Sequence, residues 1–90
     1  DGAPPLPAAV TIPTRDAGYL WDLRRFCREL TEHLDGHTRE QYLDDRVLQR
    51  AVERLLERIE EAARGVSVGT RELAPDVPWA RIVALRNFVV

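Results

Sequence analysis

Two long stretches of this sequence carry apolar residues at steps of three and four, which is the spacing of one face of an α-helix. In residues 15–35 the apolar positions are Leu20, Leu23, Cys27, Leu30 and Leu34, flanked by Tyr19, Phe26 and His33. In residues 45–64 they are Leu48, Val52, Leu55, Ile59, Ala62 and Ala63. No run has a convincing two-residue alternation of the kind that marks a β-strand, so the sequence predicts an all-α fold.

The residues that flank these stretches predict where the helices begin and end. Thr14 is the expected N-cap of the first helix, and Gly36 fits the position just past its C-terminus. Thr38 and Gln41 have the spacing of a capping box, which predicts a short helical segment before the second long helix. Gly65 is expected to end that second helix.

A third helix is predicted near the C-terminus, after a loop at residues 67–77 that holds one helical turn at residues 70–73. Asp76 is its expected N-cap, and Pro78 and Trp79 open it, because proline fits the first turn of a helix. We expect the Trp79 ring to pack on the second helix. The apolar positions are Ile82, Val83, Leu85, Val89 and Val90. Three helices with short connections form an antiparallel bundle, whose open seam a fourth helix or a second subunit would cover.

Composition restricts the setting of the chain. Its 90 residues suffice for one domain, at residues 15–90, preceded by a Pro-rich tail at residues 1–14. Cys27 is the single cysteine, which excludes a disulfide framework, favours the cytoplasm and is best explained as a small core residue. No apolar stretch approaches the roughly 20 residues of a membrane span. The net charge of −2 argues against binding nucleic acid by bulk charge, but it leaves a local basic cleft open.

Arginines recur every four residues along the second long helix, and their role has two interpretations. The stripe consists of Arg46, Arg50, Arg54 and Arg58, and the glutamates Glu53, Glu57 and Glu61 lie three residues beyond the last three of them. The stripe could follow the phosphates of a nucleic acid. Because arginine and glutamate at this spacing can form ion pairs on a helix surface, we expect a solvated face instead.

Three segments of the sequence resemble, in order, the HepT-like proteins of the HEPN superfamily. They are "RDAGYLWDLRRFCREL", "YLDDRVLQRAVERLLERIEEAARGV" and "APDVPWARIVALRNFVV", and the likeness extends over residues 15–90. The most specific pieces are "IEEAA", in which Glu60 replaces the usual glycine of the family, and "PDVPWARIVALRN". The resemblance implies a four-helix bundle that forms a homodimer and acts as a metal-independent ribonuclease toxin without a cofactor. It also implies an antitoxin partner similar to the minimal nucleotidyltransferase MntA, which can add AMP to a tyrosine of the motif.

The resemblance assigns the candidate catalytic residues. In the family an arginine is followed, after four residues, by His-x-Tyr, so Arg86 corresponds to the motif arginine and Asn87 to its polar neighbour. The histidine and tyrosine would lie beyond Val90, together with the fourth helix. We therefore expect the 90 residues to be the retained part of a longer protein and to be inactive alone. A natural truncation that has lost its activity is the alternative.

The chemistry explains why these residue types are needed. Cleavage of RNA without a metal needs a group that moves protons, for which histidine is suited, and a fixed positive charge at the phosphate, for which arginine is suited. On one helix, Arg86 and a histidine five residues later are separated by roughly 140°. Two helices that meet across a dimer could bring both pairs to one cleft.

Simpler roles remain for each candidate. Arg86 could form a surface salt bridge, and Asn87 could be a buried hydrogen-bonding residue that orients Arg86. His33 and His37 are weak candidates for the missing histidine. No His, Cys or carboxylate spacing predicts a metal site. The alternative function is a non-catalytic helical module that binds a nucleotidyltransferase-like partner.

Overall fold

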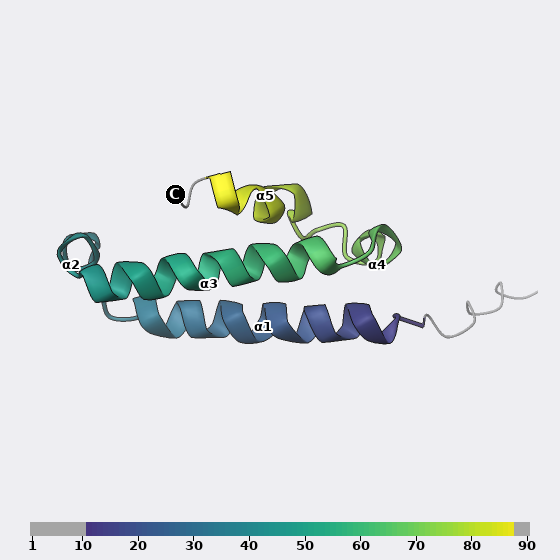
Figure 1. Ribbon diagram of the computed structural model, residues 1–90, viewed down its shortest axis with the longest axis horizontal. Helices are drawn as coiled ribbons and strands as arrows, with labels where there is room; N and C mark the ends of the chain where they lie inside the picture. The colour runs from purple at the N-terminus through teal and green to yellow at the C-terminus, as the bar shows by residue number, and fades with distance from the viewer. Residues whose placement is uncertain (1–10, 88–90) are drawn as a thin grey trace, which may run out of the picture.

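The computed structural model describes residues 11–87, apart from the side chain of Arg86, and every regular element in this range is a helix. The elements are α1 (Thr14–Leu34), α2 (Arg39–Asp44), α3 (Arg46–Gly65), α4 (Val68–Glu72), α5 (Trp79–Val83) and the 3₁₀-helix η1 (Ala84–Asn87). Helices α1 and α3 pack side by side in opposite directions, and α5 and η1 contact α3 (Figure 1). The predicted all-α class is confirmed. No helix in the described range is both long enough and apolar enough to cross a membrane.

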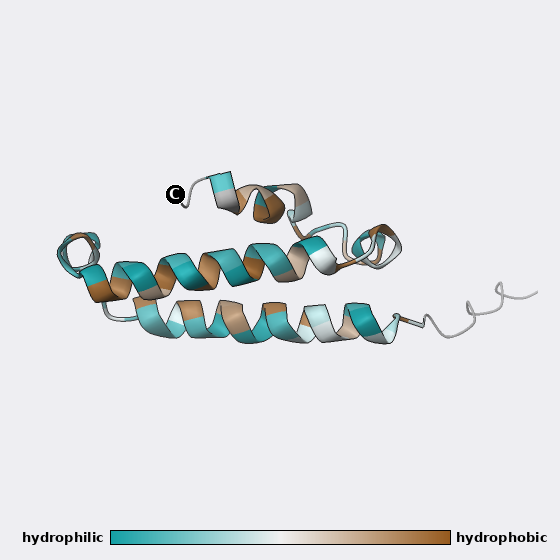
Figure 2. Cartoon of the chain, in the orientation of Figure 1, coloured by the Kyte–Doolittle hydropathy of each residue, from teal (hydrophilic) through white to brown (hydrophobic). Residues whose placement is uncertain are grey.

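Helix α3 provides most of the core, as its sequence predicts. The buried apolar residues are Leu48, Val52, Leu55, Ile59, Ala62 and Ala63, joined by Val66 just after the helix. Figure 2 shows hydrophobic segments recurring between hydrophilic ones along this helix, the pattern of an amphipathic helix with one buried face.

The buried face of α1 differs from the predicted one. Phe26 is buried against Leu55 and Ile59, and Leu23 and Leu30 pack on the same cluster. Cys27, one residue further along α1, is exposed, as is Leu34. The prediction that Cys27 is a core residue is therefore wrong: the face is rotated by one residue, so that the larger Phe26 ring meets α3. Partial burial of the thiol still raises the pKa of Cys27, which disfavours the reactive thiolate.

Two of the predicted caps are formed and two are not. Gly36 has a φ of 76° after α1, and Thr38 and Gln41 form the expected capping box with N···O distances of 2.8 and 3.1 Å. Thr14, by contrast, is the first residue of α1, whose N-cap position is Pro13. The assignment of residues 1–14 as a tail stays a prediction, since residues 1–10 lie outside the described part of the chain.

The connection between α3 and α5 contains more helix than predicted. Helix α4 occupies residues 68–72, where one turn at residues 70–73 was expected. The predicted N-cap Asp76 is wrong, because Pro78 occupies that position. The Trp79 amide donates to the carbonyl of Val77 at 2.8 Å, so the chain turns after Asp76 and leaves that carboxylate too early to cap α5.

The arginine stripe of α3 is exposed, in agreement with a solvated face. The ion pairs expected there are absent: none of its arginines has a carboxylate within 4.0 Å among the residues that the structure describes. The guanidinium of Arg58 instead lies 5.7 Å from the centre of the Phe26 ring. A cation over an aromatic face is weakly attracted to it, which explains the choice of partner.

Candidate functional site

The predicted catalytic residues lie in the 3₁₀-helix at the end of the described chain. Helix α5 ends at Val83 and the backbone tightens into η1, where a continuous α-helix was expected. Asn87 is exposed, and its side chain has no hydrogen bond to another described residue. Its alternative role, orienting Arg86 through a hydrogen bond, stays a prediction, because the side chain of Arg86 lies outside the described residues. The side chain of Arg86 and the apolar positions Val89 and Val90 lie outside the described residues.

Apolar contacts fix the position of η1. Ile82 of α5 and Leu85 of η1 pack against the cluster formed by Phe26, Leu55 and Ile59. These contacts turn one side of the α5–η1 segment toward the core, which places Asn87 on the surface. Asn87, at the end of this anchored segment, is therefore accessible to a ligand.

Arg71 of α4 connects the end of α3 to the beginning of α5. Its guanidinium donates to the carbonyls of Val66 and Ala63, both at 2.9 Å, and more weakly to that of Arg64 at 3.4 Å. The carbonyls at a helix C-terminus have no partner within the helix, so a cation at this point satisfies them and favours the helix dipole. Arg71 thereby caps the C-terminus of α3 and holds α4 against it.

Trp79 stacks on this arginine. The Arg71 guanidinium carbon is 5.7 Å from the centre of the indole ring, and the indole nitrogen of Trp79 donates to the carbonyl of Ala74 at 3.0 Å. The ring is half-buried, and these contacts are to α4 and the loop that follows it, where packing on α3 was expected. Arg71 and Trp79 together set the point from which α5 and η1 extend over α3.

Asp16 fixes the same end of the molecule from α1. Its carboxylate is buried and accepts hydrogen bonds from the Ser67 amide at 3.2 Å, the Ser67 hydroxyl at 2.5 Å and the Thr70 hydroxyl at 2.5 Å. The Ser67 and Thr70 hydroxyls are the main reason that the pKa of Asp16 is lowered. Asp16 thus binds two residues at the start of α4. Ser67, the N-cap residue of α4, makes no capping hydrogen bond with its side chain.

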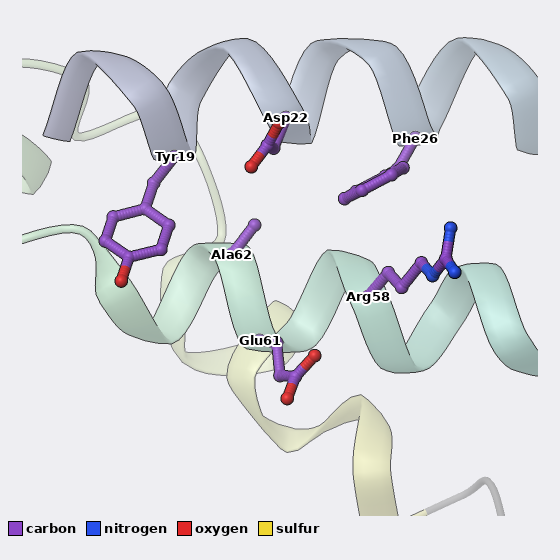
Figure 3. Close-up of a pocket in the computed structure, with 6 residues that line it drawn as sticks. All are labelled: Tyr19, Asp22, Phe26, Arg58, Glu61 and Ala62. Carbon is purple, nitrogen blue, oxygen red and sulfur yellow. The ribbon is translucent and has the colours of Figure 1, made fainter. Parts of the chain in front are cut away.

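A hollow of about 390 Å³ lies between α1 and α3. It is lined by Tyr19, Asp22, Phe26, Arg58, Glu61 and Ala62 (Figure 3). Asp22 and Phe26 project from α1 toward α3, whereas Glu61 points away from α1. Two carboxylates against one guanidinium repel a phosphate, so this hollow is a poor candidate for holding RNA.

The structure does not bring the two histidines to the candidate site. His33 and His37 are exposed, in the last turn of α1 and in the connection to α2, and neither hydrogen-bonds to Asn87. The Nδ1 atom of His37 lies 3.2 Å from the carbonyl oxygen of Asp35. Within residues 11–87 no cluster of three or more His, Cys, Asp or Glu side chains is arranged to hold a metal ion.

Sequence reasoning missed the residues that position the site. Neither Asp16 nor Arg71 is singled out by the sequence pattern as a residue that positions the site. The partners of Asp16 lie 51 and 54 residues away in the sequence. No local spacing rule detects a contact of that kind, although an aspartate near a helix start and a Ser-x-x-Thr at a second helix start are each suggestive of capping.

Comparison with known proteins identifies the family. Residues 23–90 match the family model described as "Ribonuclease HepT-like". A protein of Methanocaldococcus jannaschii named "Putative RNase MJ1380" is 31% identical over 72 residues, which are 80% of this chain and 66% of that protein. One of Caldanaerobacter subterraneus subsp. tengcongensis, named "Putative RNase TTE0752", is 35% identical over 72 residues, or 80% of this chain and 64% of that protein.

The chain thus spans slightly less than two thirds of the length of these two relatives. No solved structure gives a significant match. The family model covers α3, α4, α5 and η1 and most of α1, which are the elements that carry and position Arg86 and Asn87. This chain belongs to the HepT-like ribonuclease family.

Proposed function

We propose that this protein is a cytoplasmic ribonuclease toxin of a toxin–antitoxin pair, which cleaves RNA without a metal ion at a site between two copies of the chain. The observation that carries the proposal is the place of Arg86 and Asn87. They are the last two residues of η1, which follows the anchored α5 segment in a chain that belongs to the HepT-like family.

The chemistry assigns one role to each residue. Arg86 provides a permanent positive charge whose planar fork can bind two phosphate oxygens as negative charge builds up on them. Asn87 can hold a phosphate or ribose oxygen beside it through its amide. A histidine, expected from the family resemblance after four residues, would move the proton between the 2′-hydroxyl and the leaving oxygen. Two copies would bring two such sets to one cleft.

The family resemblance also supports a partner. We propose that a nucleotidyltransferase similar to MntA binds the toxin and silences it, by contact alone or by adding AMP to a tyrosine. The second candidate function, which holds if the protein does not cut RNA, is that of a helical module that binds the same partner without catalysis.

An activity assay on the protein expressed from its complete reading frame tests the proposal. RNA cleavage should continue in the presence of a metal chelator. Arg86→Ala should lower the rate about 100- to 1,000-fold, as expected when a group that stabilises transition-state charge is removed. Arg86→Lys should restore little, because an ammonium cannot reproduce the bidentate fork.

Arg81→Ala is the matched control, because Arg81 is an exposed arginine on α5, five residues before Arg86. It should cut RNA at nearly the parent rate. Toxicity in cells should disappear with Arg86→Ala and be suppressed by the co-expressed neighbouring nucleotidyltransferase. A complete protein that cuts no RNA, or an Arg86→Ala variant that cuts as well as the parent, would overturn the enzyme proposal in favour of the binding module.

A further inference from the structure

The solvent-facing side of α1 combines an exposed tryptophan with three arginines. Trp21, Arg24, Arg25 and Arg28 follow the spacing i, i+3, i+4, i+7, which places them on one face of the helix. They line a shallow hollow of about 160 Å³. Trp21 is 65% exposed, whereas the other aromatic side chains that the structure describes are buried or half-buried. A side chain of this size gains nothing for the fold from such a position.

The charges on this face are mostly uncompensated. Arg25 lies 3.5 Å from the carboxylate of Asp22, in an exposed pair that contributes little. Within the described residues, Arg24 and Arg28 have no carboxylate within 4.0 Å, and the guanidinium of Arg24 is 5.9 Å from the centre of the Trp21 ring. The face is thus locally cationic on a chain whose net charge is −2.

We propose that Trp21, Arg24, Arg25 and Arg28 form a binding face for single-stranded RNA, distinct from the cleavage site. A base would stack on the indole of Trp21, and the guanidinium groups would bind the phosphates on either side of it. This proposal rests on the proposed function, since it describes how the substrate strand is held. The arginines attract an anion, and the flat, exposed indole can stack on a nucleic-acid base. An acidic peptide would provide the negative charge but no base, so RNA fits this face better.

Binding of a fluorescein-labelled oligouridylate of about 12 nucleotides, within the usual range of single-strand sites, tests the proposal by anisotropy. Trp21→Ala should weaken binding about tenfold or more, because one stacked base is lost. The Trp21→Ala variant should bind inorganic polyphosphate, which has charge but no bases, as tightly as the parent does. Arg24→Gln combined with Arg28→Gln should weaken the binding of both oligouridylate and polyphosphate. It should also lower the slope of log affinity against log salt by about 1.4.

The matched control is Arg50→Gln combined with Arg54→Gln, which removes from α3 two exposed arginines that have no carboxylate of the described chain within 4.0 Å. It should change oligouridylate affinity less than twofold. All these residues are exposed, so each variant should keep the helical circular dichroism of the parent. The proposal is overturned if Trp21→Ala binds the oligouridylate as tightly as the parent, or if the α3 control loses as much affinity as the α1 variant.

Two further outcomes separate this face from other roles. If Trp21→Ala converts dimers to monomers in sedimentation while RNA affinity stays the same, the face is a protein interface and the proposal fails. Arg86→Ala should lower the cleavage rate about 100- to 1,000-fold, whereas Trp21→Ala should act mainly through the affinity for oligouridylate, because the two sites are separate. A complete protein that binds RNA through Trp21 but never cuts it would refute the ribonuclease proposal and support the binding face.

Discussion

At Gly65, the last residue of α3, a side chain would fit only if the Tyr19 ring moved. A β-carbon there would lie 2.5 Å from two ring atoms of Tyr19, closer than real contacts allow. Gly65→Ala should therefore lower the free energy of unfolding by about 1–2 kcal/mol, since the strain of overpacking exceeds the gain in helix propensity. Gly18→Ala in α1 is the control, because no atom lies within 4 Å of its β-carbon. It should raise stability by about 0.5–1 kcal/mol in chemical denaturation.

The carboxylate of Asp16 should make stability depend on pH. Hydrogen bonds from the Ser67 and Thr70 hydroxyls lower its pKa in the folded protein from the ordinary value of 3.8. A carboxyl with a lowered folded pKa stabilises the protein fully above its ordinary pKa and loses this effect as the pH falls through the folded pKa. Asp16→Asn should thus have a lower Tm than the parent at neutral pH, and the difference should shrink below pH 3.8. Asp76→Asn, at an exposed position, is the control; an Asp16→Asn difference that is constant with pH would contradict the assignment.

Among the elements, α4 connects the core to the candidate site through the stacked pair Arg71 and Trp79. Arg71→Ala removes the donor to three carbonyls and should cost about 2 kcal/mol of unfolding free energy. Trp79→Phe keeps the ring but loses the bond to Ala74, and should cost about 1 kcal/mol. A double-mutant cycle that combines Arg71→Ala with Trp79→Leu, which removes the ring, should give a coupling of about 0.5–1 kcal/mol, the range of a cation–π pair near the surface. Additive effects of the two changes would show that Trp79 does not depend on Arg71.

The elements also show where sequence reasoning succeeds. The apolar positions of the buried face of α3 are predicted correctly, because they allow a single stripe, but the burial of Glu60 beside them is not. On α1 two apolar stripes are possible, and both contain Leu23 and Leu30. One stripe includes Cys27 and the other Phe26, so only packing against α3 decides which of these two residues is buried. The position of Arg86 and Asn87 follows from the family resemblance. Their 3₁₀ conformation and the supporting contacts of Arg71 depend on tertiary structure, which local spacing does not encode.

In the whole molecule, the described core is thin. No large side chain in residues 11–87 is below 2% exposure, and four aliphatic side chains at the two ends of α3 are more than half exposed. These are Leu43 and Val47 near its start and Val68 and Leu73 after its end. A bundle of two long helices and one short segment buries too little apolar surface to be very stable alone. A second copy of the chain, as proposed for the cleavage site, would supply the missing cover.

Self-association should therefore be measurable and should contribute to stability. Sedimentation of the 90-residue chain is expected to show dimers or larger species. Because dissociation accompanies unfolding, a tenfold dilution should lower the free energy of unfolding of a dimer by about 1.4 kcal/mol and lower its Tm. The same experiment on the product of the complete reading frame shows whether any additional residues replace the second copy or add to it. A monomer at high concentration, with a Tm independent of dilution, would count against both the dimer and a cleavage site that two copies share.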